Sequence, residues 1–305
     1  MNAVKMMQGT VSLNKALLLC NVSKKAWYYT PKTRDIPPDP KVQEMVQKIA
    51  PARPTYGSRR MAAQISRELG RQVNRKAIQC IFKRLGWTQP SRTKLDIIRT
   101  NKKLPRPKAP NKFWESDMSY IWCGTDGWGY CFNVLDVFTR QWLAFVLASR
   151  ATRREAIRAV TDAVAAADPT LPGLTLRVDN GSQYTSREFR SSMAALEISL
   201  EYIYVNTPEQ NGHIESFHKT LKKEYVWPHE FADIQEAREA LLAAFEDYNH
   251  RRIHSAIQYL TPSEFAKKHG QGSEGATPDI PEVSSVNKML RKSVSMGRGH
   301  SSMRP

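Results

Sequence analysis

The chain has 305 residues, 41% hydrophobic and 25% charged, which is enough for two or three domains with a sizeable core. It contains no apolar run of the roughly 18 residues that a membrane-spanning helix needs, and its N-terminus lacks the apolar stretch of a secretory signal. The formal net charge is +17, and the four cysteines, Cys20, Cys80, Cys123 and Cys131, form no Cys-x-x-Cys pair. We therefore expect a cytoplasmic protein without membrane contact and without a cysteine-based zinc site.

The basic charge is concentrated in the N-terminal third. Residues 1–110 contain 24 Lys and Arg against 5 Asp and Glu, a net charge of +19, whereas residues 111–305 contain 22 against 24, a net charge of −2. A region this basic repels itself unless a polyanion neutralises it, which favours a nucleic-acid-binding module joined to a near-neutral body. A basic surface that serves only solubility is the alternative.

The first predicted elements are short helices. "SLNKALLLC" and "NVSKKAWYY" predict a helical pair within residues 11–29, part of an N-terminal segment that we place at residues 1–36. "PPDP" indicates a linker, and the next helix is predicted at residues 41–50, ended by Pro51 and Pro54.

Residues 56–87 predict a helix-turn-helix within a module at residues 41–90. Ser58 would cap the first helix, Gly70 would end it, and Asn74 would cap the second. The outward face of the second helix carries side chains suited to phosphates and guanine edges in the major groove: Arg75, Lys76, Gln79, Lys83 and Arg84. A plain helical hairpin is the alternative.

A basic linker is predicted at residues 91–112, after which the sequence becomes β-rich. "WESDMSYIWC", "WGYCFNVLDVF" and "QWLAFVLAS" predict three strands with tight antiparallel connections. Alternating helices and strands follow, at about residues 152–167, 174–178, 186–195, 198–204 and 211–226. The order βββ-α-β-α-β-α predicts an α/β fold with a mixed sheet flanked by helices, as in ribonuclease-H-like proteins.

Two more helices are predicted before the end of a domain that we place at residues 113–270. The first covers residues 233–252. The second begins with a capping box of Thr261 and Glu264 and ends at Gly270. Residues 271–305 are rich in Ser, Gly and Pro and are expected to be disordered.

Asp179 lies directly after the predicted strand 174–178, before "NGSQY". Asn-Gly is a strong hairpin signal, but "TSREFRSSMAAL" then predicts a helix with a capping box of Thr185 and Glu188. The segment is therefore predicted as strand, loop and helix. This places Asp179 at the carboxyl end of a strand, where α/β sheets bind ligands.

Two other acids share this kind of position. Asp117 lies in the first β-run, and Glu215 lies one turn into the long helix. Alone, each has a plain interpretation as a strand, turn or helix surface charge. Together, Asp117, Asp179 and Glu215 would form an oxygen-ligand site for Mg²⁺ or Mn²⁺, and two such ions could clamp the attacking and leaving oxygens of a phosphoryl transfer.

The helix that carries Glu215 has two distinct faces. The predicted buried stripe is Ile214, Phe217, Leu221 and Tyr225. The neighbouring face holds Glu215, His218, Lys219 and Lys222, one acid followed by basic groups suited to phosphate.

The motifs resemble those of the OrfB-type transposases of bacterial insertion sequences, relatives of retroviral integrases. "WESDMSYI", "DNGSQYTS" and "NGHIESFHKTLKKEY" surround the three acids, and 35 residues separate Asp179 from Glu215, the spacing of this Asp-Asp-Glu class. "YNHRRIHSAIQYLTPSEF" resembles the block that closes these catalytic domains, and "PTYGSRRMAAQI" resembles their helix-turn-helix module. The resemblance covers about residues 10–270.

The resemblance implies that the three acids bind two Mg²⁺ or Mn²⁺ ions and that DNA is the substrate. Hydrolysis at the element's ends would free a 3′-OH that attacks another phosphodiester, without a covalent protein–DNA intermediate. Lys222 would contact DNA near the cut, and Asn180 would orient the loop or a phosphate. We further expect Lys219, His218 and Arg252 to contact DNA.

The resemblance also implies partners. Joining two DNA ends requires at least two copies of the chain. Active transposases of this group are usually frameshift fusions with an upstream-frame protein that adds a leucine zipper. No sustained heptad pattern occurs here, so a product that is regulatory or inactive alone is an open alternative.

Other titratable residues need separate interpretations. Asp136 is predicted as a turn or core-edge residue, and Asp126 as a hairpin turn residue. His250 and His254 are four residues apart but lack partner ligands, which favours structural or DNA-facing roles. A ribonuclease-H-type nuclease is a second alternative, and its fourth carboxylate would have to come from Asp136 or Glu188.

Overall fold

The computed structural model describes six stretches of the chain: residues 2–7, 10–29, 37–88, 107–167, 171–204 and 208–270. Most of the predicted basic linker, and the whole predicted tail at 271–305, lie outside the described residues. The chain divides into a small unit, Met1–Asp39, and a large unit, Pro40–Pro305. No helix within the described stretches is long and apolar enough to cross a membrane.

The small unit is helical. Its elements are α1 (Asn2–Met7), α2 (Leu13–Leu19) and α3 (Lys24–Trp27). They pack around Val4, Ala16 and Leu17. The predicted helical pair is confirmed as α2 and α3, whereas α1 was not predicted.

The helical module of the large unit consists of α4 (Pro40–Ala52), α5 (Ser58–Leu69) and α6 (Arg75–Arg84). Asn74 caps α6 by accepting the Lys76 N–H at 2.8 Å, as predicted, and Gly70 ends α5 with φ 62°. The predicted cap at Ser58 is wrong, because Gly57 is the N-cap and Ser58 is the first helical residue. The predicted outward side chains of α6 are all exposed.

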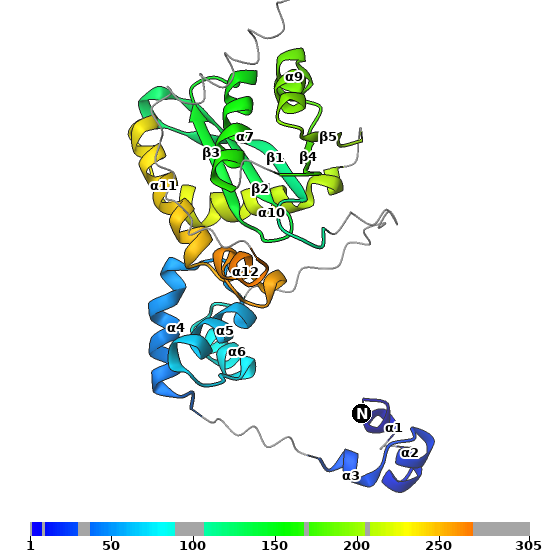
Figure 1. Ribbon diagram of the computed structural model, residues 1–305. Coiled ribbons are helices and arrows are strands. Elements are labelled where there is room, and N and C mark those ends of the chain that lie inside the picture. Colours follow the sequence, from blue (N-terminus) through cyan, green and yellow to red (C-terminus); the bar gives the residue numbers. More distant parts are fainter. Residues whose placement is uncertain are drawn as a thin grey trace, which may run out of the picture. The chain divides into compact units, whose positions relative to one another are not determined.

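Five strands form one sheet in the order β3-β2-β1-β4-β5 (Figure 1). They are β1 (Phe113–Trp122), β2 (Trp128–Asp136), β3 (Trp142–Ala148), β4 (Thr175–Val178) and β5 (Ser199–Tyr202). The first three strands pair antiparallel, and β4 pairs parallel with both β1 and β5. Parallel pairs need crossover connections, which α7 (Arg153–Ala167) and α9 (Arg187–Ala195) provide. The predicted mixed sheet and element order are confirmed.

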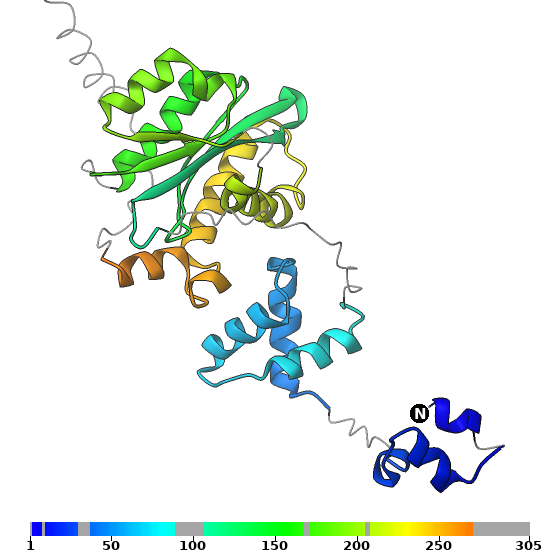
Figure 2. The same ribbon diagram turned by 90° about the vertical axis from the view of Figure 1, so that its right-hand side faces the viewer.

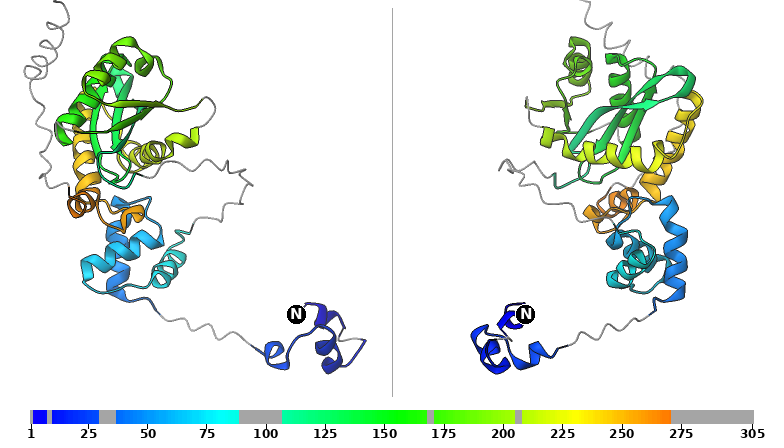
Figure 3. Two further views of the ribbon diagram at one scale, coloured as in Figure 1. Left: turned by 45° about the vertical axis from the view of Figure 1, so that its right-hand side comes forward. Right: turned by 180° about the vertical axis from the view of Figure 1, so that it is seen from behind.

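Helices cover both faces of the sheet (Figures 2 and 3). On one face, α7 and α9 pack on a core that includes Trp114, Phe132 and Val134. On the other, α10 (Gly212–Leu221) and α11 (Ile234–His250) pack on a core that includes Ile121 and Trp142. Because strand side chains alternate between faces, the odd-numbered residues of β1 point toward α10.

The entry into α9 differs from the prediction. A separate helical turn, α8 (Ser182–Thr185), precedes it, and Ser186 is the N-cap that accepts the Phe189 N–H at 3.2 Å. The predicted capping box of Thr185 and Glu188 is therefore wrong. Thr185 instead donates its hydroxyl to the Gly181 carbonyl within α8, and Glu188 pairs with Arg153.

The long predicted helix is present, but it changes type near its end. After α10 the chain forms a π-helical turn, η3 (Lys222–Val226), which brings Glu224 into the interior. The last helix, α12 (Pro262–Lys268), has the predicted capping box of Thr261 and Glu264. Its C-cap is His269, one residue before the predicted Gly270.

Candidate active site

Asp117 lies in β1, and Asp179 directly follows the neighbouring parallel strand β4. Glu115 of β1 is paired in register with Arg177 of β4, and each acid stands two residues beyond that pair. Because side chains alternate along a strand, a step of two keeps both acids on the face that α10 covers. Asp179 also accepts the Gly181 N–H at 2.9 Å, so the turn after β4 fixes its carboxylate.

Glu215 joins this pair electrostatically from the first turn of α10. The pKa of Asp117 is raised to about 7, chiefly because the carboxyl is buried, and further because Asp179 and Glu215 carry negative charge nearby. Lys222 opposes this shift. The charges of Asp179, Glu215 and Lys222 thus all act on the Asp117 carboxyl.

The donor set fits a hard divalent cation. Carboxylate oxygens are the ligands that Mg²⁺ and Mn²⁺ prefer, and the mutual repulsion that raises the pKa of Asp117 would be relieved by a cation. Within the stretches that the structure describes, however, no three His, Cys, Asp or Glu side chains already form a metal-holding group.

His218 lies beside Asp117 on α10. Its Nδ1 is 3.6 Å from Asp117 Oδ2, and its Nε2 is 3.2 Å from Asn133 Nδ2. Burial and the charge of Lys222 lower the pKa of His218 to about 3, so the ring is neutral near pH 7 and the contact with Asp117 is not an ion pair. Since the Asn133 amide donates, Nε2 accepts and Nδ1 carries the hydrogen.

The other predicted DNA contacts near the acids lie at different depths. Lys219 is exposed, Lys222 is half-buried, and Asn180 is exposed. The Asn180 side chain donates to the Ile203 carbonyl at 2.8 Å and so ties the loop after β4 to the end of β5. Its loop-orienting role has a geometric basis, whereas contacts of all three residues and His218 with DNA stay predictions.

Sequence reasoning missed a second buried acid on β1. Glu115 is fully buried, and burial raises its pKa to about 7. Its Oε2 accepts the Ile214 N–H at 2.8 Å, one residue before Glu215. The available signal was the pair Glu115 and Asp117 at spacing i, i+2, which places two acids on one face of a single strand.

The other acids on and near the sheet have structural partners. Asp136 is buried and accepts N–H bonds from Asn111 at 2.7 Å and Thr139 at 2.6 Å, which agrees with its predicted turn and core-edge role. Asp126, in the predicted hairpin turn, accepts the Ile234 N–H at 3.0 Å at the start of α11. Glu188 is paired with Arg153. Neither Asp136 nor Glu188 is therefore directed at a metal site.

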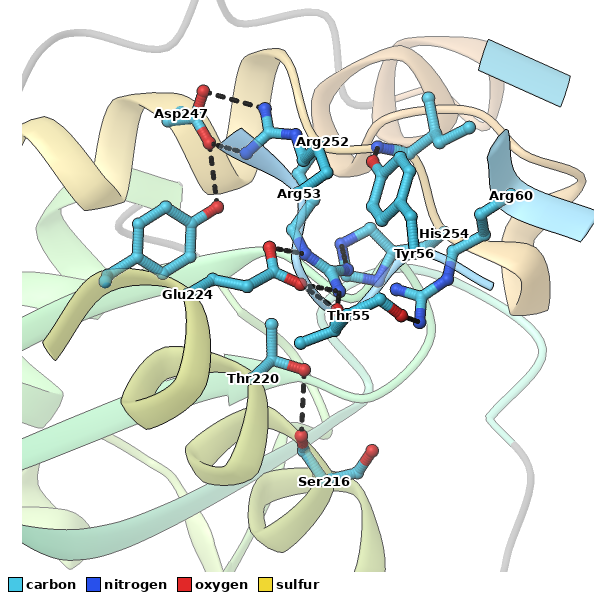
Figure 4. Close-up of polar contacts among 12 residues, drawn as sticks. Arg53, Thr55, Tyr56, Arg60, Ser216, Thr220, Glu224, Asp247, Arg252 and His254 are labelled. Carbon is cyan, nitrogen blue, oxygen red and sulfur yellow. Dashed lines mark hydrogen bonds and ion pairs between the residues drawn. The ribbon is translucent and has the colours of Figure 1, made fainter. Parts of the chain in front are cut away.

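Arg252 belongs to a buried ion-pair cluster (Figure 4). It is 3% exposed, and its Nε and Nη2 donate to Glu224 of η3 at 2.8 and 2.9 Å. The Thr55 hydroxyl, from the turn between α4 and α5, donates to the same carboxylate. The expectation that Arg252 contacts DNA does not fit this geometry, because its guanidinium is directed into the protein.

A second ion pair, Arg53 with Asp247, joins the helical module to the α/β domain near Arg252. Arg53 forms a two-bond pair with Asp247, at 2.5 and 2.9 Å, and Tyr225 donates to the same carboxylate at 2.8 Å. His254 is 3.2 Å from Arg252, and burial lowers its pKa, so it is a neutral interior residue. His250 lies 3.7 Å from Glu246 on α11, which also fits a structural role.

Comparison with known proteins assigns these parts to families. Residues 107–208 and 196–262 match two families described as "Integrase core domain", and residues 39–94 match one described as "HTH-like domain". A protein of insertion element IS407 from Burkholderia multivorans is 30% identical over 275 residues, which cover 89% of this chain and 94% of the relative. The chain belongs to the insertion-sequence transposases with an integrase core domain.

Other relatives carry the transposase name directly. The transposase for IS904 of Lactococcus lactis is 33% identical over 52% of this chain and 62% of its own length. The putative transposase InsK for IS150 of Escherichia coli is 25% identical over 83% of this chain and 93% of its own length. The predicted family is confirmed, and the chain is a DNA transposase of the integrase type.

Among solved structures, the chain is similar to a simian T-cell lymphotropic virus intasome in complex with a PP2A regulatory subunit. The identity is 20%, the match covers 71% of this chain and 74% of that chain, and the TM-score is 0.46. The HTLV-2 integrase catalytic core domain in complex with magnesium is 18% identical, over 53% of this chain and 99% of that chain, with a TM-score of 0.41.

Proposed function

We propose that this transposase cuts the ends of its element with Asp117, Asp179 and Glu215 and joins the freed 3′-OH to new DNA. The observation that supports the proposal is that Asp179, which follows β4, and Glu215 of α10 both act electrostatically on Asp117 of β1, on the face of the sheet that α10 covers. The alternative nuclease without strand transfer is less well supported, because Asp136 and Glu188 both have other partners.

In this proposal the three carboxylates hold two Mg²⁺ or Mn²⁺ ions. Bound ions of this kind activate the attacking oxygen and stabilise the leaving oxygen of an in-line displacement. Lys219 of α10 and Lys222 at the start of η3 bind the phosphates beside the cut, since both follow Glu215 along this continuous helical segment. The neutral ring of His218 holds Asn133 and Asp117 in place.

The remaining parts bind and assemble. The exposed face of α6 in the helical module, proposed as a domain of residues 41–90, lies in the major groove of the terminal repeat. Two DNA ends need at least two copies of the chain, and the upstream-frame protein of the element is a further partner. The protein acts in the bacterial cytoplasm, where its DNA substrate lies.

The test is a joining assay. Labelled DNA carrying the element's terminal repeat is incubated with the chain and Mg²⁺ or Mn²⁺, and the products are separated by size. Nicked ends and joined products that disappear in Asp179→Ala are expected. Cutting without joining would identify a nuclease, and binding without cutting would identify a DNA-binding regulator.

Lys83→Ala on α6 is expected to weaken DNA binding about equally for all sequences. It removes one phosphate contact, so the negative slope of log K against log salt should become shallower by about one. The measurement is a salt titration of binding to duplex DNA by fluorescence anisotropy. Lys48→Ala, on the exposed surface of α4, is the matched control and should leave the slope unchanged. Equal slopes for Lys83→Ala and the native chain would exclude α6 as the DNA-reading helix.

A further inference from the structure

Glu115 and Arg177 form a buried pair next to the proposed metal site, two residues before Asp117 and Asp179. Glu115 is fully buried and Arg177 is 2% exposed, and they are register partners on the parallel strands β1 and β4. Arg177 Nη1 lies 3.7 Å from Glu115 Oε1. The Arg177 guanidinium carbon also lies over the Phe113 ring, 4.6 Å from the ring centre.

Both members of the pair hold the start of α10. Glu115 Oε2 accepts the Ile214 N–H at 2.8 Å, and Arg177 Nη1 donates to the Gln210 carbonyl at 2.6 Å. These bonds fix the chain on both sides of the helix N-terminus. The residue that follows Ile214 is Glu215.

We propose that Glu115 and Arg177 are positioning residues that set the spacing of the three metal-binding acids. Glu115 lies two residues before Asp117, and Arg177 lies two residues before Asp179. The proposal deepens the proposed function and rests on it. Glu115 and Arg177, which also pairs with Glu201 of β5 at 2.8 Å, thereby connect all three segments that carry an acid.

The details of the pair favour positioning over a purely structural role. Replacing a buried ion pair with well-packed apolar residues is often neutral or stabilising, so stability alone does not require this pair. Glu115 Oε1 has no hydrogen-bond partner, which is a costly arrangement for a buried atom. Directional bonds from a fixed carboxylate and a planar guanidinium hold a helix start at one distance from the sheet, which apolar contacts do not do.

The test measures metal affinity in the full-length chain. Mn²⁺ binding is followed by electron paramagnetic resonance for the native chain, Glu115→Ala and Glu115→Gln, and the Mn²⁺ concentration for half-maximal end cleavage is measured in parallel. Glu115→Ala is expected to weaken Mn²⁺ binding about 10- to 100-fold. Glu115→Gln should recover most of that loss, because its carbonyl can still accept the Ile214 N–H.

Controls separate positioning from folding. Asp136→Asn changes a buried acid on the adjacent strand whose hydrogen-bond partners, Asn111 and Thr139, lie outside α10, so it should lower the melting temperature without changing Mn²⁺ affinity. If Glu115→Ala does not fold, Arg177→Lys serves instead. It keeps the charge but lacks the two separate nitrogens with which Arg177 bonds the Gln210 carbonyl and the Glu201 carboxylate, so it should also weaken Mn²⁺ binding.

The outcomes are distinguishable. Native Mn²⁺ affinity in folded Glu115→Ala or Arg177→Lys overturns the positioning role and leaves the proposed function intact. If Asp117→Asn does not reduce the Mn²⁺ binding of the native chain, the proposed function itself fails. The positioning role then fails with it.

Discussion

Asp117→Asn is expected to lower end cleavage and joining at least about a hundredfold while making the metal-free protein more stable at pH 8. Activity falls because an amide is a poorer Mg²⁺ ligand than a carboxylate and carries no charge to hold the ion. Stability rises because the native carboxylate is largely removed from water and is repelled by Asp179 and Glu215. The gain should be on the order of 2 kcal/mol, since each unit of pKa shift corresponds to about 1.4 kcal/mol and the side chain is partly exposed.

The stability gain should depend on pH with a defined sign. Asp117 has a folded-state pKa of about 7, above the value of about 4 for an unfolded aspartate. Between these values the folded protein holds a proton that the unfolded chain has released, so native stability falls as pH rises from about 4 to 7. The variant's advantage is therefore absent below pH 4 and complete above pH 7. Because the pKa of Glu115 is also about 7, the stability of the variant still decreases somewhat as pH rises over this range.

Thermal melts in EDTA from pH 4 to 8, together with the joining assay, test this prediction. Glu188→Gln is the control, because that acid is on the surface of α9 and pairs only with Arg153 among the contacts described. It should join DNA like the native chain and show no pH-dependent gain. Joining by Asp117→Asn at the native rate would remove Asp117 from the site.

Arg252→Met should destabilise the large unit by about 3–5 kcal/mol. The side chains of Arg252 and Glu224 are 3% and 0% exposed, so the substitution leaves a buried carboxylate without its charged partner. Urea unfolding followed by tryptophan fluorescence measures the change. The double variant Arg252→Met with Glu224→Met should recover much of the loss, because no unpaired charge is left inside.

An exposed ion pair provides the comparison. Arg67 and Glu264 are bonded at 2.6 Å, but their side chains are 40% and 41% exposed. Arg67→Met should cost at most about 1 kcal/mol. Equal effects of Arg67→Met and Arg252→Met would contradict the buried character of the Arg252 pair.

The Arg252 and Glu224 cluster also links the helix that carries Glu215 to the helical module. Glu224 lies on the π-helical turn that continues α10, and its partner Thr55 lies in the helical module. The ordinary helical repeat read from sequence does not predict a π turn, since the wider turn shifts every later side chain around the axis. The prediction that Arg252 contacts DNA does not fit, because its donors are bound to this buried acid.

Local patterns were sufficient for most helices and strands, but not for α1, α8 or the π turn η3. The strand before Asp179, the helix signals after it and the cap at Asn74 depend on neighbours in the chain, so the sequence alone predicts them. Where two local signals competed, as at Thr185 and Ser186, the prediction missed by one residue, because an extra helical turn used the first hydroxyl.

What only the tertiary structure decided are the contacts between distant segments. The sequence by itself determined the element order, the basic module and the identity of Asp117, Asp179 and Glu215 as the acids to examine. The sheet register pairs Glu115 with Arg177, and folding brings Ile214 to that pair from almost a hundred residues further along the chain. The interior roles of Glu115, Arg252 and His218 depend on burial and on partners across the fold, and neither quantity is encoded in spacing along one segment.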